Sequence, residues 1–593
     1  MVPADFAANS RRALLDARTV AGHWVGELSA SALSTATALF TLWRHQLATG
    51  TSHRTRIDAG LAWLASTQNT DGGFGDTVKS VSNVSTTALC WAAFAADDSG
   101  RHAAVEARAG EWLTRHAGSL DATPLSAAIV KIYGKDRTFS VPILTMLAVA
   151  GRLGPDGWRL VPQLPFELAA CPFWVFQWVR LPVVSYALPA LIAIGQVRHH
   201  HRPTWFLPLR WLRNAVAAKT LRKLREIQPT TGGYLEATPL TSFVGMALID
   251  AGLATHEVVT EGVRFLEASQ RPDGSWPIDT DLSTWATTLS VNALSPDALT
   301  LTERAAVRDW LLGQQYRVPH PYTHAAAGGW AWTPLPGGVP DADDTAGALL
   351  ALHRLGDIDG RVTEAATLGC QWLFDLQNRD GGIPTFCRGW TGLPFDRSSN
   401  DLTAHALLAW EAWRLHLPRD RLATAAAAAV SHLLRTQRPD GSWAPLWFGN
   451  QHSPDPADIH NLTYGTSRVL RLRATPWPTE LPDFAAALDR AQAWLEANRN
   501  PDGGWGGRLG TPSTIEETAL ACEAWPNERG MAWLVAATEN GTHFPPSPIG
   551  FYFANLWYFE ALYPLIYVNA AITAAEKISA SGGCQPAVFF PAW

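Results

Sequence analysis

The chain has 593 residues and a net charge of −6, from 47 basic and 53 acidic side chains, and it contains 28 Trp. No cluster of Lys and Arg alternates with aromatic residues as in proteins that bind single-stranded nucleic acid, so we expect no nucleic-acid partner. The six Cys are scattered without CxxC or metal-ligand spacing, which favours reduced thiols and argues against a metal site. The length is sufficient for two domains.

The N-terminal part of the sequence predicts a cytoplasmic protein that touches a membrane. Residues 1–30 lack the basic, apolar and small-residue pattern of a signal sequence. Residues 164–197 are largely apolar, but Arg180, Pro182 and Pro189 interrupt them, and the longest charge-free run, 181–197, is slightly short for a span. We therefore expect a monotopic segment that dips into one leaflet. Basic residues follow it, suited either to anionic headgroups or to an ordinary solvated helix face: His199, His200, His201, Arg202, Arg210, Arg213, Lys219, Arg222 and Lys223.

A short motif recurs five times along the chain. It reads Gln-Arg-Pro-Asp-Gly-Ser-Trp at 270–276 and 437–443 and Asn-Pro-Asp-Gly-Gly-Trp at 500–505, with degenerate copies at 68–74 and 377–383. The Pro-Asp-Gly core is turn chemistry, because Pro fixes φ and Gly accepts a positive φ. Each copy therefore predicts helix, turn and helix, with the Gln bonding backbone at the turn and the Trp stacking on it. Strand signals are weak, so the predicted fold is all-α, as a solenoid or a closed ring of helical hairpins.

Three carboxylates stand within four residues, at Asp341, Asp343 and Asp344, inside otherwise apolar, Trp-rich sequence. At a helix entry, Asp341 and Asp344 share one face while Asp343 points elsewhere. Repulsion between the charges, together with burial, would raise at least one pKa in the group and leave a protonated carboxylic acid at neutral pH. The alternative is a helix N-terminus whose acidic residues are favoured only by the helix dipole.

The repeats and the Asp-Ala-Asp-Asp-Thr-Ala string at 341–346 together closely resemble the squalene-hopene cyclase family of class II triterpene cyclases, along nearly the whole chain. The resemblance implies two α/α barrels: a catalytic one from residues 1–30 and 281–593, and an inserted one from 31–280 that carries the membrane-facing segment 164–197. It also implies proton-initiated cyclisation of squalene or a similar linear polyprene, attachment to one leaflet of the cytoplasmic membrane, and no cofactor. It allows a homodimer.

The resemblance assigns roles to the acidic residues. Asp343 would be the general acid, and Asp341 and Asp344 would hold its environment. The family's histidine lies in an Asp-x-Thr-Ala-His string, matched here by 401–405, so His405, held by Asp401, would polarise the acid. Protonating an unactivated alkene needs a strong acid, and a neutral Asp becomes stronger when a cation or donor stabilises the carboxylate it leaves.

Aromatic faces stabilise carbocations without acting as nucleophiles. By spacing within the resemblance, six residues are candidates for this role, each with core packing as the alternative: Trp285, Trp332, Phe386, Trp447, Phe544 and Phe559. Arg137, matched across an insertion or deletion, is a candidate anchor for the acidic cluster. The segment 549–560 departs from the family, with Leu556 and Phe559 where two cavity tyrosines are usual, so the product is not implied.

Other classes stay open beside this one. The same acid chemistry could act on a prenyl diphosphate or a meroterpenoid, although we find no convincing acidic magnesium site in the N-terminal part. A non-catalytic relative that binds polyprenyl lipids is a further alternative, disfavoured by the intact Asp343, Asp401 and His405. A zinc-dependent prenyltransferase subunit or a class I terpene synthase would need a Cys-containing zinc set or a DDxxD motif, and neither is present.

Overall fold

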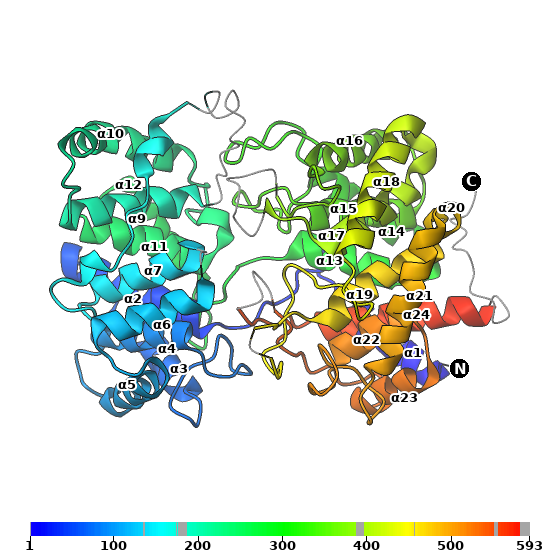
Figure 1. Cartoon of the computed structure of the whole chain (residues 1–593), viewed down its shortest axis with the longest axis horizontal. Coiled ribbons are helices and arrows are strands. Elements are labelled where there is room, and N and C mark those ends of the chain that lie inside the picture. Colours follow the sequence, from blue (N-terminus) through cyan, green and yellow to red (C-terminus); the bar gives the residue numbers. More distant parts are fainter. Residues whose placement is uncertain are drawn as a thin grey trace.

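The computed structural model describes residues 2–134, 137–172, 175, 187–386, 396–455, 457–550 and 556–580. Helices account for the regular structure of these residues, which contain isolated β-bridges such as Leu28–Glu560 but no β-strand. The all-α prediction is confirmed. The helices form two bodies that lie side by side, joined by extended connections (Figure 1).

The first body contains a ring of inner helices within the described residues. Helices α2, α4, α7, α9 and α11 contact one another in this order, and α11 closes the ring on α2. The other helices pack outside this ring. The bounds in this body are α2 (Ala32–Thr49), α3 (Arg54–Thr67), α4 (Val84–Ala93), α5 (Ala103–Ala117), α6 (Ala122–Tyr133), α7 (Arg137–Val149), α9 (Leu188–His201), α10 (Leu207–Glu226), α11 (Thr238–Asp250) and α12 (Glu257–Ser269).

The second body is a closed α/α barrel. Its inner helices α13, α15, α17, α19, α22 and α24 contact in succession, and α24 returns to α13. Because an outer helix returns the chain between them, the inner helices run in one direction. The bounds are α13 (Ser283–Ala293), α14 (Leu301–Gly313), α15 (Ala342–Leu355), α16 (Gly360–Leu376), α17 (Asn400–Ala412), α18 (Arg419–Thr436), α19 (Leu462–Leu470), α20 (Trp477–Glu480), α21 (Pro482–Ala497), α22 (Ile515–Ala524), α23 (Glu528–Ala537) and α24 (Tyr563–Ala580).

Both ends of the chain meet in the second body. Helix α1 (Ala4–Asp16) packs on α24, and Arg11 forms an ion pair with Glu576 at 3.1 Å (Figure 1). The proposed domain limits at residues 30 and 280 lie between α1 and α2 and between α12 and α13. Their status as independent domains stays a prediction.

The recurrent Gln ties successive hairpins together. Gln437 donates from Nε2 to the carbonyl of Gly441 in its own turn (2.9 Å) and to the carbonyl of Ala487 in α21 (2.7 Å). Gly441 has a φ of 95°, and a Cβ there would lie 2.7 Å from the Arg490 carbonyl oxygen, so the turn requires glycine. The indole of Trp443 donates to the Leu433 carbonyl at 2.8 Å. The predicted bond from Gln to the turn is confirmed. The Trp indole satisfies a carbonyl in the last turn of the preceding helix.

Two further copies of the repeat were not recognised in the sequence. Gln228 bonds the carbonyls of Gly232 and Val258, and Tyr234 donates to the Leu224 carbonyl as the repeat Trp does elsewhere. Gln315 makes the equivalent bonds to Gly328 and Ala365. Sequence spacing hid these copies, because Tyr replaces Trp in one and an insertion separates Gln from Gly in the other.

The predicted membrane segment 164–197 is only partly described, and its attachment to a membrane stays a prediction. Residues 173–174 and 176–186 lie outside the described residues. The remaining apolar stretch forms α9, whose Ile192, Ile194 and Val197 are fully buried in the ring of inner helices and so cannot face lipid. Among the helices that the structure describes, none has both the length and the apolar character to cross a membrane.

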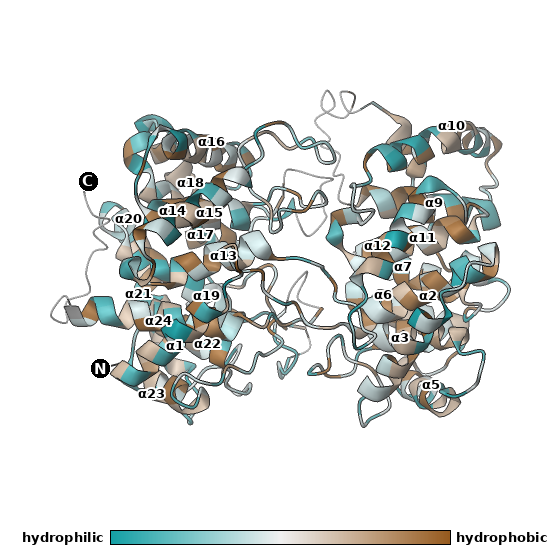
Figure 2. Ribbon diagram, turned by 180° about the vertical axis from the view of Figure 1, so that it is seen from behind, coloured by the Kyte–Doolittle hydropathy of each residue, from teal (hydrophilic) through white to brown (hydrophobic). Residues whose placement is uncertain are grey.

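Helix α10 lies at the outer edge of the first body (Figures 1 and 2). Large apolar side chains are exposed at its start and just before it. Trp205 is 89% exposed and Trp211 is 74% exposed. Phe206, Leu207 and Leu212 are exposed beside them, and we call these five residues the α10 patch. Exposed clusters of this kind mark contact surfaces.

Candidate active site

The acidic cluster begins an inner helix of the second body. Asp341 is the N-cap of α15, and its Oδ1 accepts a hydrogen bond from the backbone N–H of Asp344 at 2.8 Å. Asp341 and Asp344 are 4% and 3% exposed, whereas the Asp343 side chain is 24% exposed. The predicted separation of Asp343 from the other two carboxylates is therefore confirmed.

The two buried carboxyls hold protons more tightly than usual. Burial, with the neighbouring charge of Asp343, raises the pKa of Asp341 to about 7. Burial and the charge of Asp341 raise the pKa of Asp344 well above its ordinary value. Two carboxyls buried together cannot both ionise cheaply, so this pair retains a proton near neutral pH.

His405 contacts the third carboxyl. Its Nδ1 lies 2.5 Å from Oδ1 of Asp343, although the two residues come from different inner helices, α17 and α15. The His405 side chain is mostly buried. When Nδ1 carries the proton, the imidazole donates to Oδ1, which leaves Oδ2 of Asp343 as the oxygen that can carry the acid proton.

Asp401 is near this pair but has another partner. Its Oδ1 accepts a hydrogen bond from the Ser399 hydroxyl, and no hydrogen bond between Asp401 and His405 is found among the described contacts. Burial, opposed by this hydrogen bond and aided by the charge of Asp343, raises the pKa of Asp401 to about 6. The resemblance implies that Asp401 holds His405, but no direct hydrogen bond between the two is found among the described contacts.

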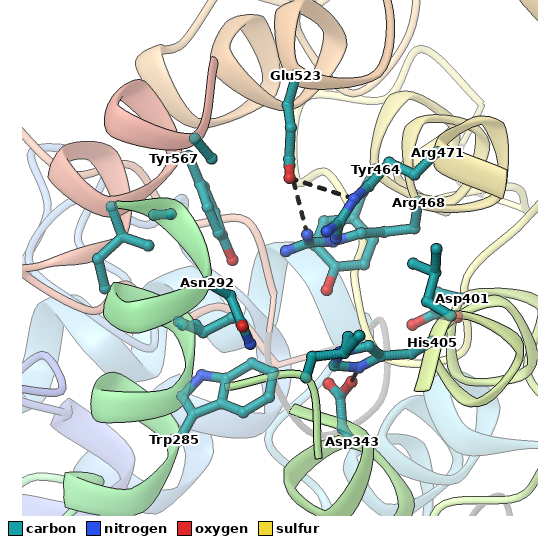
Figure 3. Close-up of a pocket in the computed structure, with 16 residues that line it drawn as sticks. Trp285, Asn292, Asp343, Asp401, His405, Tyr464, Arg468, Arg471, Glu523 and Tyr567 are labelled. Carbon is teal, nitrogen blue, oxygen red and sulfur yellow. Dashed lines mark hydrogen bonds and ion pairs between the residues drawn. The ribbon is translucent and has the colours of Figure 1, made fainter. Parts of the chain in front are cut away.

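A cavity of about 40 Å³ extends from this pair into the barrel (Figure 3). Its walls mix polar groups with apolar side chains, and every inner helix of the barrel contributes to it. This volume is enough for water or a very small ligand. It is lined by Trp285, Leu289, Asn292, Ala293, Asp343, Leu350, Asp401, His405, Leu408, Tyr464, Arg468, Arg471, Glu523, Ile566, Tyr567 and Ala570.

Four of the six aromatic candidates gather around the start of α15. The rings of Trp332 and Phe386 meet edge to face with centroids 6.4 Å apart, and Phe386 pairs with Asp341 through a β-bridge. Trp285 donates its backbone N–H to the Trp332 carbonyl, and its side chain lines the cavity. Trp447 joins the group through the Thr385 hydroxyl, to which its indole donates at 2.7 Å.

The other predicted site residues lie apart from this group. Phe544 is half-buried against the core, and Phe559 lies under the Lys79 ammonium, 5.3 Å from the ring centroid. Arg137 begins α7 in the first body with an exposed side chain, and no contact between it and the aspartates appears in the described part of the chain. An exposed Arg cannot anchor a buried carboxyl pair, so its anchoring role has no support here.

Comparisons with known proteins identify the relatives of this chain. A family model for the squalene-hopene cyclase N-terminal domain matches residues 7–204, and the model for the C-terminal domain matches residues 282–543. The chain belongs to the squalene-hopene cyclase family.

Relatives of this squalene-hopene cyclase family member include enfumafungin synthase from Hormonema carpetanum, 25% identical over 90% of this chain and 45% of that protein. The squalene–hopene cyclase of Zymomonas mobilis is 24% identical over 84% of this chain and 80% of that protein. The chain spans about half the length of enfumafungin synthase and of a second curated relative. The solved structure of ent-copalyl diphosphate synthase from Streptomyces platensis has a TM-score of 0.52 and 20% identity, covering 98% of this chain and 100% of that one, which supports the fold.

Several cavity residues of this family member were not found by sequence reasoning. Tyr464 and Arg468 are four positions apart on α19 and therefore share a helix face, which places both in the cavity. Arg471, Glu523 and Tyr567 complete its polar wall. Helical spacing relates Tyr464 to Arg468, but only tertiary packing shows that this face is turned towards Asp343.

The described residues contain no group of three or more His, Cys, Asp and Glu side chains placed to hold a metal ion.

Proposed function

We propose that this chain is a class II terpene cyclase that cyclises squalene or a similar linear polyprene by protonation. The contact of 2.5 Å between His405 Nδ1 and Asp343 Oδ1 carries the proposal, because it engages one oxygen of a partly exposed carboxyl and leaves the other able to carry the acid proton. Membership of the squalene-hopene cyclase family supports the same activity.

In the proposed reaction, Asp343 gives the proton on Oδ2 to the terminal alkene. The O–H bond breaks, a C–H bond forms, and the remaining alkene carbon becomes a tertiary cation that the next double bond attacks. His405 stabilises the carboxylate left behind by donating to Oδ1. The cascade ends when a proton leaves the last cation or when water adds to it, and Asp343 is then reprotonated for the next turnover.

The four aromatic side chains around the start of α15 would stabilise the carbocations of the cascade. Trp332, Phe386, Trp285 and Trp447 lie beside the acid and offer π faces that cannot add to a carbocation. Phe544 would act later in the cascade, at a position farther along the polyprene, whereas Phe559 would help to shape the folding of the substrate and the early rings.

We further propose that the α10 patch rests on one leaflet of the cytoplasmic membrane. Trp and Phe favour the interfacial region of a bilayer, and the same helix exposes Arg210, Lys219 and Arg222 for anionic headgroups. Arg213 is excluded from this role, because it is buried in a bidentate ion pair with Glu167 at 3.0 Å. A polyprene dissolved in the membrane would reach the enzyme from that side. A homodimer stays a prediction.

The activity is tested by incubating detergent-solubilised protein with squalene and analysing the extract by gas chromatography and mass spectrometry, with Asp343→Asn in parallel. An isomer of squalene or its hydrate that forms with the wild type and not with the variant supports the proposal. Equal conversion by both proteins contradicts the acid assignment. A second arm with prenyl diphosphates, run on the same folded protein, identifies a cyclase of the alternative substrate class.

A further inference from the structure

A buried arginine faces the acid from the opposite wall of the cavity. The Arg468 side chain, on α19, is 12% exposed and lines the same cavity as Asp343 (Figure 3). Its guanidinium lies between two aromatic rings, 5.1 Å from the centroid of Tyr464 and 5.2 Å from that of Tyr567. Contacts with two ring faces hold the guanidinium in one orientation. Guanidinium groups stay charged in proteins, so this is a fixed positive charge.

This charge is only partly neutralised. Glu523 on α22 is the carboxylate paired with Arg468 (3.6 Å), and it is shared with Arg471 (3.2 Å). One carboxylate between two guanidinium groups leaves a net positive charge of one. Lys577 and Arg354 add further positive charge nearby, and burial together with the charges of Arg354 and Arg471 lowers the pKa of Lys577 to about 8.

The groups that face Asp343 from the other elements offset this charge only in part. His405 and Asp401 approach from α17, and Tyr464 and Tyr567 approach from α19 and α24. Asp401 has a pKa raised to about 6 by burial, and Asp341 on the helix of Asp343 itself has a pKa raised to about 7 by burial. Both carboxyls therefore carry less negative charge near neutral pH than exposed aspartates would.

We propose that Arg468 is a positioning residue that strengthens the acid: its fixed charge, clamped by Tyr464 and Tyr567 and moderated by Glu523, stabilises the carboxylate that Asp343 becomes. The inference rests on the proposed function. Charges interact more strongly across a largely protein-lined cavity than across bulk water.

The test is the pH–rate profile of cyclisation. Arg468→Met should lower the plateau rate by about tenfold or more and move the alkaline limb of the profile up by about one pH unit, since a weaker acid keeps its proton to higher pH. Glu523→Gln should move the same limb down, because it removes the counter-charge. Arg468→Lys should restore most of the wild-type behaviour. Arg473→Met, which removes a partner of the exposed Asp489, is the control and should leave the limb unmoved.

A purely structural role for Arg468 predicts something else. The rate would fall with no shift of the limb, or the Arg468 and Glu523 variants would shift it in the same direction, and either result overturns the inference. A second readout needs no turnover: the infrared carboxyl band that disappears in Asp343→Asn is titrated in each variant. Opposite shifts of its midpoint uphold the inference even if no polyprene is cyclised, and coincident midpoints refute it even in an active enzyme.

Discussion

His405 and Asp343 join two neighbouring inner helices of the barrel, with Nδ1 of the imidazole 2.5 Å from Oδ1 of the carboxyl. Each residue lies in the first turns of its inner helix, and the two helices are neighbours in the ring. The contact fixes which oxygen of Asp343 is engaged by protein and which is free. A carboxyl with one oxygen held by a donor is suited to release a proton from the other.

Replacement of His405 should therefore slow the chemical step. We expect His405→Phe to lower the cyclisation rate by about 10²–10⁴-fold, since it removes the donor that stabilises the Asp343 carboxylate. The rate is measured at saturating substrate, with thermal unfolding as a check of the fold.

A second buried histidine provides the control for that measurement. His432 on α18 lies 3.5 Å from Asp380, outside the cavity, and burial lowers its pKa. His432→Gln should leave the rate within about twofold of the wild type, so a similar loss in both variants would show that the His405 effect is one of packing.

A buried glutamate should make the protein less stable as the pH rises. Burial and the adjacent Glu516 raise the pKa of Glu517 to about 8, and its Oε1 accepts from Asn461 at 3.0 Å. The folded protein thus keeps a proton that the unfolded chain loses above about pH 4, so the contribution of Glu517 to stability is full below that pH and is lost as the pH rises towards 8. Glu517→Gln mimics the protonated form and should raise the free energy of unfolding at pH 8 by about 1 kcal/mol or more.

The comparison between two pH values isolates this effect. The gain in Glu517→Gln should shrink when unfolding is measured near pH 5, and the exposed Glu528→Gln should show neither a gain nor a pH dependence. A destabilised Glu517→Gln at pH 8 would mean that the carboxylate is ionised in the folded protein, contrary to the prediction.

The sequence contained enough information for the acidic cluster and less for its surroundings. Helical geometry alone separates Asp343 from Asp341 and Asp344, and the turn chemistry of the repeats explains the bonds of Gln437. The sequence does not mark Arg468 as a site residue, because a single Arg in a largely apolar helix belongs to no recognisable motif. Its partners come from α22 and α24, and only the closed ring brings them together.

Hydropathy does not distinguish a helix buried in protein from a helix buried in lipid. Residues 188–197 are apolar because α9 is an inner helix covered by protein, and the same composition would suit a helix in lipid. The α10 patch was overlooked because its Trp and Phe residues stand among basic residues, which lowers the average hydropathy of the segment. Exposure, which a linear sequence does not give, separates the two cases.

The α10 patch should determine membrane binding. We expect the double variant Trp205→Ser, Trp211→Ser to bind anionic liposomes at least about tenfold more weakly in a flotation assay, because burying each indole in the interface contributes on the order of 1 kcal/mol or more. Leu301→Ser with Leu415→Ser removes equally exposed apolar side chains from the second body and should bind as the wild type does. Equal binding by both double variants would place the membrane contact elsewhere.

The repeat Gln should be worth more to stability than its surface position indicates. Gln437 bonds the carbonyls of Gly441 and Ala487, so Gln437→Ala leaves two acceptors without this donor and loosens α18 from α21. We expect a loss of about 1–3 kcal/mol in the free energy of unfolding, measured by denaturant titration. Gln492→Ala, on the exposed face of α21, removes only a bond to Glu496 at 3.3 Å and should cost less than about 0.5 kcal/mol. If both variants lose the same stability, the hairpins are held by apolar packing and the Gln bonds are incidental to it.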